Sequence, residues 1–234
     1  MRANAPSVPE LEAAARRIRR QVVTMVARLG IGYLQQGLGA ADLFAALYAG
    51  ELRLDERDPN WADRDRLLLS TAHNTAVFYA AMAERGLIPE AALEDYTRDG
   101  SPFEVNASER VGPLVEATCG SLGQGLSVGV GMALSLRRRG SPARVYVILG
   151  DGELQEGQVW EAAMSAAGFG LGNLCLIIDR NFMQVEGHTD AVMPMEPVAE
   201  KWTAFGWRTV TVDGHDIAAI VAALDDARDR RAHV

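Results

Sequence analysis

Hydrophobic residues in the second half of the chain form short continuous runs separated by a longer stretch with helical spacing. Residues 143–150 and 173–181 contain the continuous apolar runs 145–149 and 174–178, which are typical of strands buried on both faces of a sheet. Between them, residues 154–170 place Val159, Ala163 and Ala166 on one helical face. This strand–helix–strand order predicts an α/β fold, with a doubly wound, mostly parallel sheet flanked by helices.

The rest of the chain is also predicted to alternate between helices, strands and loops. Apolar residues from Val8 to Met25 recur every three or four positions, and Gly30 marks the end of that predicted helix. The glycine-rich stretch 30–39 is expected to be a loop. The other expectations are helices at 40–50, 74–85 and 216–231, strands at 67–69 and 207–214, and a long polar loop at 92–113.

Composition narrows the functional classes. The chain has 234 residues, 48% of them hydrophobic, and a formal net charge of -8. We expect one domain over residues 1–234 with a loose arm at 1–8, no nucleic-acid partner and no membrane partner. No apolar run has spanning length, so the expected location is cytoplasmic. Cys119 and Cys175 are expected to be reduced, buried thiols.

Oxygen-bearing side chains stand at the ends of the two apolar strands. Asp151, flanked by Gly150 and Gly152, ends the first strand, and Asn181 ends the second. Parallel strands of one βαβ unit present these ends at one sheet edge, where ligands of open α/β sheets bind. A carboxylate and an amide oxygen suit Mg²⁺ or Ca²⁺, and the helix that follows favours a phosphate. The residues therefore indicate a metal–diphosphate site.

These motifs resemble the thiamine-diphosphate enzymes of the transketolase family. The GDGELQEG run at 150–157 and the IIDRN run at 177–181 together match the family's cofactor fingerprint. RDRLLLSTAH at 64–73, EATCGSLGQGLSVGVGMAL at 116–134 and VDGHD at 212–216 are similar to further family segments. The similarity runs from about Ile18 to Asp226 and indicates the N-terminal, diphosphate-binding half of a split, two-component enzyme.

The resemblance implies a cofactor, thiamine diphosphate, and roles for individual residues. The metal, Mg²⁺ or Ca²⁺, would take Asp151, Asn181 and the backbone carbonyl of Met183. His73 would lie near the diphosphate and the reacting carbon, and Glu156 would join a network that links paired cofactors. The cofactor-binding residues would be His73, Gly120, Ser121, Leu122, Gly123, Gly150, Asp151, Gly152, Glu153, Asn181 and Met183.

The resemblance also implies a partner. In this family a glutamate that activates the cofactor lies on a pyrimidine-binding domain, and no segment of this chain is similar to that domain. The implied partner is a C-terminal transketolase-like subunit that carries the glutamate, in an α2β2 heterotetramer acting on small-molecule substrates. The implied reaction is transfer of a two-carbon ketol unit from a ketose-type donor to an aldehyde acceptor, with the cofactor supplying the carbanion chemistry.

Two departures from the family leave other functions open. The first Gly-rich loop carries Ile31 and Tyr33 where a histidine is usual, and Asn106 stands near the place of a second one. Loss of these groups removes side chains that titrate near neutral pH. One alternative is decarboxylation of a 2-oxo acid followed by acyl transfer, and another is a non-catalytic subunit. A dinucleotide-binding oxidoreductase is rejected, because no strand precedes the GSLGQG run.

Overall fold

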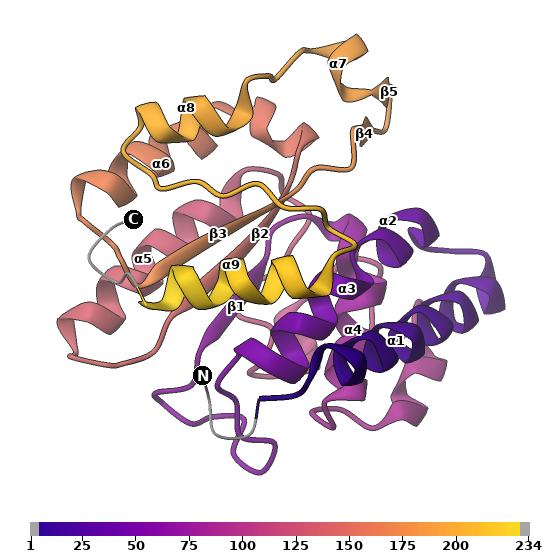
Figure 1. Cartoon of the computed structure of the whole chain (residues 1–234). Coiled ribbons are helices and arrows are strands. Elements are labelled where there is room, and N and C mark those ends of the chain that lie inside the picture. Colours follow the sequence, from indigo (N-terminus) through magenta and orange to yellow (C-terminus); the bar gives the residue numbers. More distant parts are fainter. Residues whose placement is uncertain (1–4, 230–234) are drawn as a thin grey trace.

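The computed structural model describes residues 5–229, and its centre is a small parallel sheet (Figure 1). The three strands are β1 (Arg66–Leu69), β2 (Val145–Gly150) and β3 (Leu174–Asp179), in the order β1-β2-β3. Arg66 pairs with Val145, and Val145 pairs with Leu174, so all three strands run in the same direction and in register. A separate two-stranded ribbon, β4 (Met183–Gln184) with β5 (Gly187–His188), lies beyond the end of β3.

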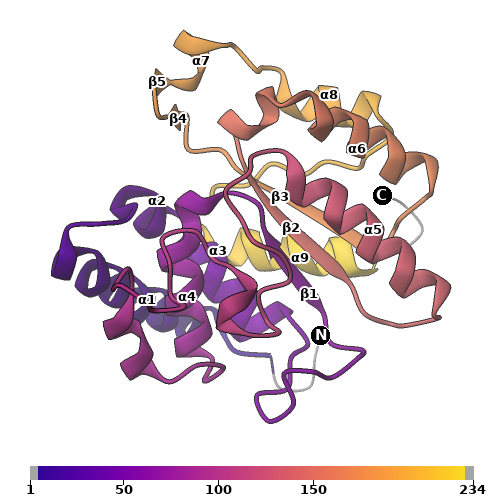
Figure 2. The ribbon, with the colours of Figure 1, turned by 180° about the vertical axis from the view of Figure 1, so that it is seen from behind.

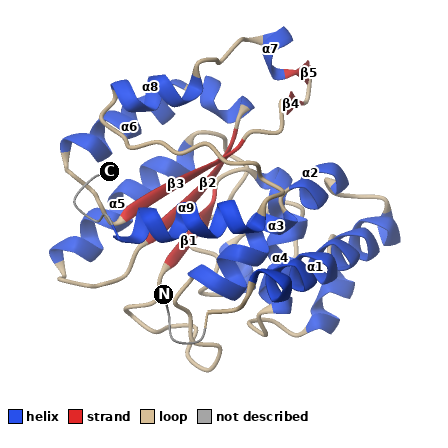
Figure 3. Cartoon of the chain, in the orientation of Figure 1, coloured by secondary structure: helices blue, strands red, loops and turns tan. Residues whose placement is uncertain are grey.

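Helices cover both faces of this sheet, as Figure 3 shows with the strands in red. The α-helices are α1 (Val8–Leu29), α2 (Leu34–Gly39), α3 (Ala41–Ala45), α4 (Thr75–Glu84), α5 (Gln124–Arg138), α6 (Gly157–Gly168), α7 (Thr189–Val192), α8 (Val198–Ala204) and α9 (Ile217–Asp229). A π-helix, η1 (Ala46–Glu51), continues α3, and short 3-10 turns form η2 (Ala72–Asn74), η3 (Glu90–Asp95), η4 (Glu109–Val111) and η5 (Gly152–Gln155). The expected α/β architecture is confirmed.

The alternation of side chains along the strands separates the core into two clusters. Tyr146 and Ile148 of β2 face one cluster, which α1, α3, α4 and α9 complete. Val147 and Leu149 face the other cluster, which is formed with α5, α6 and α8. Seen from behind, α5 and α6 lie in front of the sheet (Figure 2). Because both strand faces are buried, the apolar runs in the sequence are continuous rather than alternating.

The ends of α1 follow from local sequence. The Glu10 carboxylate accepts hydrogen bonds from the Ser7 backbone N–H and from the Ser7 hydroxyl, both at 2.7 Å. Gly30 ends the helix in a left-handed conformation, with φ of 67°. Of the expected loose arm at 1–8, residues 1–4 lie outside the described residues, residues 5–7 form no helix, and Val8 already begins α1.

Two sequence predictions were wrong. Residues 34–39 form the short helix α2 rather than a loop, because Gly37 packs closely on Val22 of α1. Residues 207–214, expected to be a strand, form none within the described chain. They run beside β3 without pairing to it, and a cavity of about 740 Å³ is lined by both segments. Their alternating sequence favours a strand, but a strand exists only where a neighbour supplies its hydrogen bonds.

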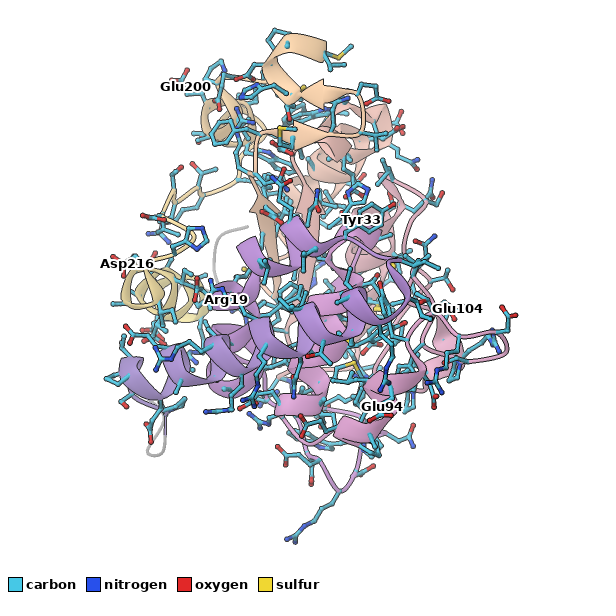
Figure 4. The ribbon with its side chains drawn as sticks, turned by 90° about the vertical axis from the view of Figure 1, so that its right-hand side faces the viewer. Arg19, Tyr33, Glu94, Glu104, Glu200 and Asp216 are labelled. Atoms are coloured by element: carbon cyan, nitrogen blue, oxygen red, sulfur yellow. The ribbon has the colours of Figure 1, made fainter. Side chains whose placement is uncertain are left out.

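A polar contact attaches the segment before α9 to helices α1 and α3. The carboxylate of Asp42 on α3 lies 3.0 Å from Nδ1 of His215, and it also pairs with Arg19 of α1. Figure 4 shows Arg19 beside the segment that carries Asp216, immediately before α9. This contact ties the segment before α9 to α1 and α3.

Candidate functional site

The carboxyl ends of β2 and β3 meet at one edge of the sheet. Gly150 pairs with Asp179 in the strand register, and the N–H of Asp151 donates to the carbonyl of Asp179 at 3.2 Å. The chain then leaves both strands on the same side, with the 3-10 turn η5 after Asp151 and the β4–β5 ribbon after Asn181. The two residues that the sequence places at strand ends therefore do lie at a common edge.

The carboxylate of Asp151 is buried and its orientation is fixed by hydrogen bonds. Its side chain is 1% exposed. Oδ2 accepts from the backbone N–H of Phe182 at 2.8 Å, from the Thr189 hydroxyl at 3.2 Å and from Arg180 at 3.2 Å. Oδ1 accepts only from the N–H of Gly152, at 2.9 Å, among the described residues. One oxygen is thus used for positioning, and the other keeps acceptor capacity for a ligand.

Asn181 and Met183 form a tight turn beside this carboxylate. The Asn181 side-chain oxygen accepts the Met183 N–H at 3.0 Å. Phe182 between them has a φ of 62°, which is uncommon for a residue with a Cβ. A Cβ at Gly152 would lie 3.1 Å from Cβ of Gln184, so this ribbon packs directly on the GDG turn.

These residues fit a hard cation that shares its coordination with a diphosphate. A carboxylate, an amide oxygen and a main-chain carbonyl are the oxygen ligands that Mg²⁺ and Ca²⁺ prefer. No group of three or more His, Cys, Asp or Glu side chains that could hold a metal occurs among residues 5–229. A cation at Asp151 would therefore need further oxygens from a bound anion or water.

Glu153 connects three segments underneath the site. Oε1 accepts the N–H of Gly123 at 2.8 Å and a hydrogen bond from the Ser70 hydroxyl, and Oε2 accepts the N–H of Gly150 at 3.2 Å. Glu153 is 3% exposed, and burial raises the pKa of its carboxyl. Because its oxygens accept hydrogen bonds from these three segments, Glu153 holds the Gly-rich segment against the ends of β1 and β2.

The Gly-rich segment needs glycine at defined places. Gly120, with φ of 105°, donates its N–H to the carbonyl of Ser70 at 3.2 Å. A Cβ at Gly120 would lie 2.8 Å from Nδ2 of Asn106, and one at Gly125 would lie 2.4 Å from Cβ of Ser70. Side chains at these positions would push the segment away from β1. Ser121 and Leu122, between these contacts, are exposed and accessible to a ligand or a partner.

His73 lies in η2, directly after β1, and is half-buried. Its ring meets that of Tyr33 edge to face, with centroids 4.4 Å apart. Burial lowers the pKa of the imidazole, and the nearby charge of Asp179 opposes this effect. The neighbouring Asn74 donates to Asp179 at 3.0 Å. The histidine turn is thereby tied to the end of β3 and is held as a neutral base or donor near neutral pH.

Glu156 is exposed at the N-terminus of α6. Its Cβ lies 2.8 Å from the position that a Cβ of Gly123 would take. Glu156 thus stands on the surface beside the Gly-rich segment. The expected residues therefore gather around one sheet edge, with Glu156 at its rim and Glu153 underneath it.

Sequence reasoning missed four residues that position this site: Ser70, Asn74, Arg180 and Thr189. Ser70 and Asn74 belong to the RDRLLLSTAHN run, and Arg180 lies between two residues of the IIDRN run. All three therefore stand within or beside motifs that the sequence analysis had already identified. Nothing in the sequence indicates Thr189, which is brought to Asp151 by the fold of the ribbon.

Comparison with known proteins decides the family. The family described as "Transketolase, thiamine diphosphate binding domain" matches residues 11–233. The chain belongs to this family. It is 45% identical over 225 residues to an uncharacterised transketolase family protein of Sinorhizobium fredii, covering 96% of this chain and 80% of that protein. Over 219 residues it is 39% identical to the 6-deoxy-6-sulfo-D-fructose transketolase subunit SqwG of a Clostridium species, covering 94% and 80%.

A solved structure shows which part of a transketolase this domain corresponds to. The chain superposes on the transketolase of Pichia stipitis in complex with sedoheptulose-7-phosphate, with a TM-score of 0.89 and 31% identity. The match covers 95% of this chain and 35% of that one, so this chain spans about a third of a full-length transketolase. The predicted resemblance to the diphosphate-binding domain of a split transketolase is confirmed. No helix among residues 5–229 is long and apolar enough to cross a membrane.

Proposed function

We propose that this chain is the N-terminal subunit of a two-component, thiamine-diphosphate-dependent transferase that moves a two-carbon ketol unit from a ketose-type donor to an aldehyde acceptor. The arrangement of Asp151 carries the proposal, because one carboxylate oxygen is fixed by three donors and the other faces the GDG turn. A pyrimidine-binding subunit would complete the site in an α2β2 assembly. The subunit designation of the Clostridium relative supports the need for a partner subunit.

When bound, thiamine diphosphate supplies the carbanion chemistry of the reaction. Asp151, Asn181 and the Met183 carbonyl would hold Mg²⁺ or Ca²⁺. The Gly-rich segment 120–123 would lie along the cofactor, with Gly150 and Gly152 allowing a close approach of the diphosphate to the backbone. The cofactor contacts expected of Ser121, Leu122 and Glu153 belong to this proposal, and Glu153 would act through its hold on Gly123.

His73 is the group of this chain suited to proton transfer or hydrogen bonding at the substrate. Its lowered pKa keeps the imidazole neutral near pH 7, so it can accept a proton or donate its N–H. Glu156, exposed at the rim, would reach a second subunit rather than the substrate. Both cysteines are free thiols, which supports our further proposal of a cytoplasmic location.

A second candidate function rests on the two places where histidines usual in this family are absent. Ile31 and Tyr33 in the first Gly-rich loop, and Asn106 in the later segment, stand where histidines that handle sugar hydroxyls are usual in this family, so the imidazoles that serve as acid–base groups are missing there. This difference favours a donor other than a sugar phosphate. Decarboxylation of a 2-oxo acid with transfer of the acyl unit is therefore the alternative to be tested.

The experiment has two stages. Thiamine diphosphate with Mg²⁺ is titrated by calorimetry into this chain alone and into its mixture with a candidate C-terminal subunit. The expected result is binding that appears or tightens in the mixture and is lost in Asp151→Asn. The mixture is then assayed for cleavage of ketose phosphates and for carbon dioxide release from pyruvate. Ketose cleavage supports ketol transfer, carbon dioxide alone supports the alternative, and binding without either reaction supports a non-catalytic subunit.

A further inference from the structure

Arg180 is the one cation that contacts the candidate metal ligand Asp151 in the described structure. Its Nη1 lies 3.2 Å from Oδ2 of Asp151. The residue lies between the end of β3 and Asn181, so its position is fixed by the same turn that presents the amide oxygen. A guanidinium remains charged at every physiological pH, and this one stands beside the carboxylate to which a divalent cation would bind.

The guanidinium is held in place from its other sides. Glu196 accepts from its Nε at 2.8 Å and from its Nη2 at 2.5 Å, and Asp190 lies 3.5 Å away. The guanidinium carbon stands 4.3 Å from the ring centroid of Phe182. With 17% of the side chain exposed, Arg180 is anchored whether or not Asp151 shares its charge with another ligand.

We infer that Arg180 is the resident counter-ion of Asp151 and makes binding of the divalent cation conditional on the diphosphate. This inference rests on the proposed function. Arg180 neutralises Asp151 in the ligand-free protein and repels a metal ion placed at Oδ1. A diphosphate brings negative charge that offsets this repulsion, so cation and anion bind much more strongly together than the cation does alone.

The physical reason is the low effective dielectric around a buried carboxylate. Charges that are a few ångströms apart near a protein surface interact more strongly than they do in bulk water, and partial exposure of the arginine reduces this interaction. Glu196 and Asp190 screen part of the guanidinium charge. A neutral side chain at position 180 should therefore strengthen binding of the cation alone, by about tenfold as an order of magnitude.

The coupling between the two ligands is the quantity that distinguishes this role from a structural one. Linkage requires that the factor by which thiamine diphosphate tightens cation binding equals the factor by which the cation tightens thiamine diphosphate binding. If Arg180 creates part of this dependence, removing its charge reduces the factor in both directions. A residue that only stabilised the loop would weaken both ligands and leave cation binding without diphosphate no stronger.

The test uses Mn²⁺ as the metal probe, measured by electron paramagnetic resonance, with the full chain and its partner subunit, with and without thiamine diphosphate. Arg180→Gln is expected to bind Mn²⁺ about tenfold more tightly without thiamine diphosphate and to show a smaller coupling factor. Arg180→Lys keeps the charge and should resemble the wild type. Arg98→Gln, on an exposed arginine whose guanidinium pairs with Asp95, is the matched control for net charge and should leave Mn²⁺ binding unchanged.

A variant with the opposite expected sign keeps the proposal falsifiable if Arg180→Gln does not fold. Glu196→Gln removes a carboxylate that screens Arg180 and is 55% exposed, so it should fold and bind Mn²⁺ more weakly without thiamine diphosphate. Unchanged or weaker Mn²⁺ binding in folded Arg180→Gln, or unchanged binding in Glu196→Gln, overturns the counter-ion role. If the wild type with thiamine diphosphate binds no more Mn²⁺ than Asp151→Asn does, the proposed function fails as well.

Discussion

The rings of Tyr33 and His73 meet edge to face, with their centroids 4.4 Å apart. Tyr33 stands just before α2, and His73 just after β1, so the contact joins two loops at the edge of the sheet (Figure 4 labels Tyr33). The tyrosine is 37% exposed. The imidazole of His73 is therefore in contact with a phenol ring that is itself partly open to solvent.

The first prediction concerns His73. His73→Ala should reduce turnover by the two-subunit enzyme by about two orders of magnitude or more, a typical contribution of a general acid or base. It should change the dissociation constant of thiamine diphosphate much less, since the glycine-rich backbone makes the cofactor contacts in the proposal. Tyr33→Leu keeps apolar cover on the imidazole and should shift the KM for the donor more than kcat. Equal loss of binding and turnover in His73→Ala would assign the histidine a structural role.

The second prediction follows from the direction of the pKa shift at His73. Burial places the folded-state pKa below the ordinary value of about 6.5. The unfolded chain then binds more protons than the folded protein as the pH falls, so the contribution of His73 to stability is lost below about pH 6.5. Denaturant titrations between pH 5 and 8 should show a smaller loss of unfolding free energy on acidification in His73→Gln than in the wild type. An identical acid dependence in both proteins would contradict the shift.

The third prediction separates the two tasks of Asp151. Because four hydrogen bonds end on a buried carboxylate, Asp151→Ala should cost about 2–4 kcal/mol of unfolding free energy as well as metal binding. Asp151→Asn keeps the acceptor oxygen and should lose metal-dependent cofactor binding at a smaller stability cost. Calorimetric titration and thermal unfolding measure the two effects independently.

The fourth prediction uses two glycines of the same helix. A Cβ at Gly125 would lie 3.0 Å from the backbone Cα of Ser70, so Gly125→Ala should destabilise the protein by about 1–3 kcal/mol. A Cβ at Gly131 meets nothing within 4 Å, and Gly131→Ala should stabilise α5 by about 0.5–1 kcal/mol. Urea unfolding of the isolated chain measures both changes. Equal effects in the two variants would show that α5 is not packed tightly against Ser70.

The fifth prediction concerns Glu153. Glu153→Ala leaves the N–H groups of Gly123 and Gly150 without their acceptor, and the unfolding free energy should fall by about 2–4 kcal/mol. Glu156→Ala removes an exposed carboxylate three positions away and is the matched control, expected to change the stability of the isolated chain by less than about 0.5 kcal/mol. If the two variants unfold at the same temperature, the hydrogen bonds of Glu153 contribute nothing to the stability of the folded chain.

The sequence predicted those parts of the fold in which pattern and packing agree. Apolar runs at 143–150 and 173–181 specified β2 and β3 because side chains on both faces of each strand pack against the two core clusters, fully buried in the central strand β2 and mostly half-buried in the edge strand β3. The sheet edge that joins Asp151 and Asn181 followed from strand direction alone. Family resemblance, rather than spacing, supplied the places of His73 and Glu156.

Other features depend on contacts that a pattern does not contain. Residues 207–212 alternate like a strand but have no partner in the described structure, so local propensity was misleading. The glycines of α2 suggested a loop, whereas close packing of Gly37 on α1 permits a helix. Thr189 reaches Asp151 across 38 positions, and no local signal encodes such a contact.

The hydrogen bond between Ser70 and Glu153 has a consequence for how the molecule forms. It joins residues 83 positions apart, and Gly123 meets the same carboxylate from a third segment. Bringing such distant residues together is the slow part of folding, since the entropy of closing long loops is lost before the contact forms. A ligand that needs all three segments binds only to molecules in which all three have folded and come together. Thiamine diphosphate would therefore select fully folded molecules during refolding and increase their share by mass action.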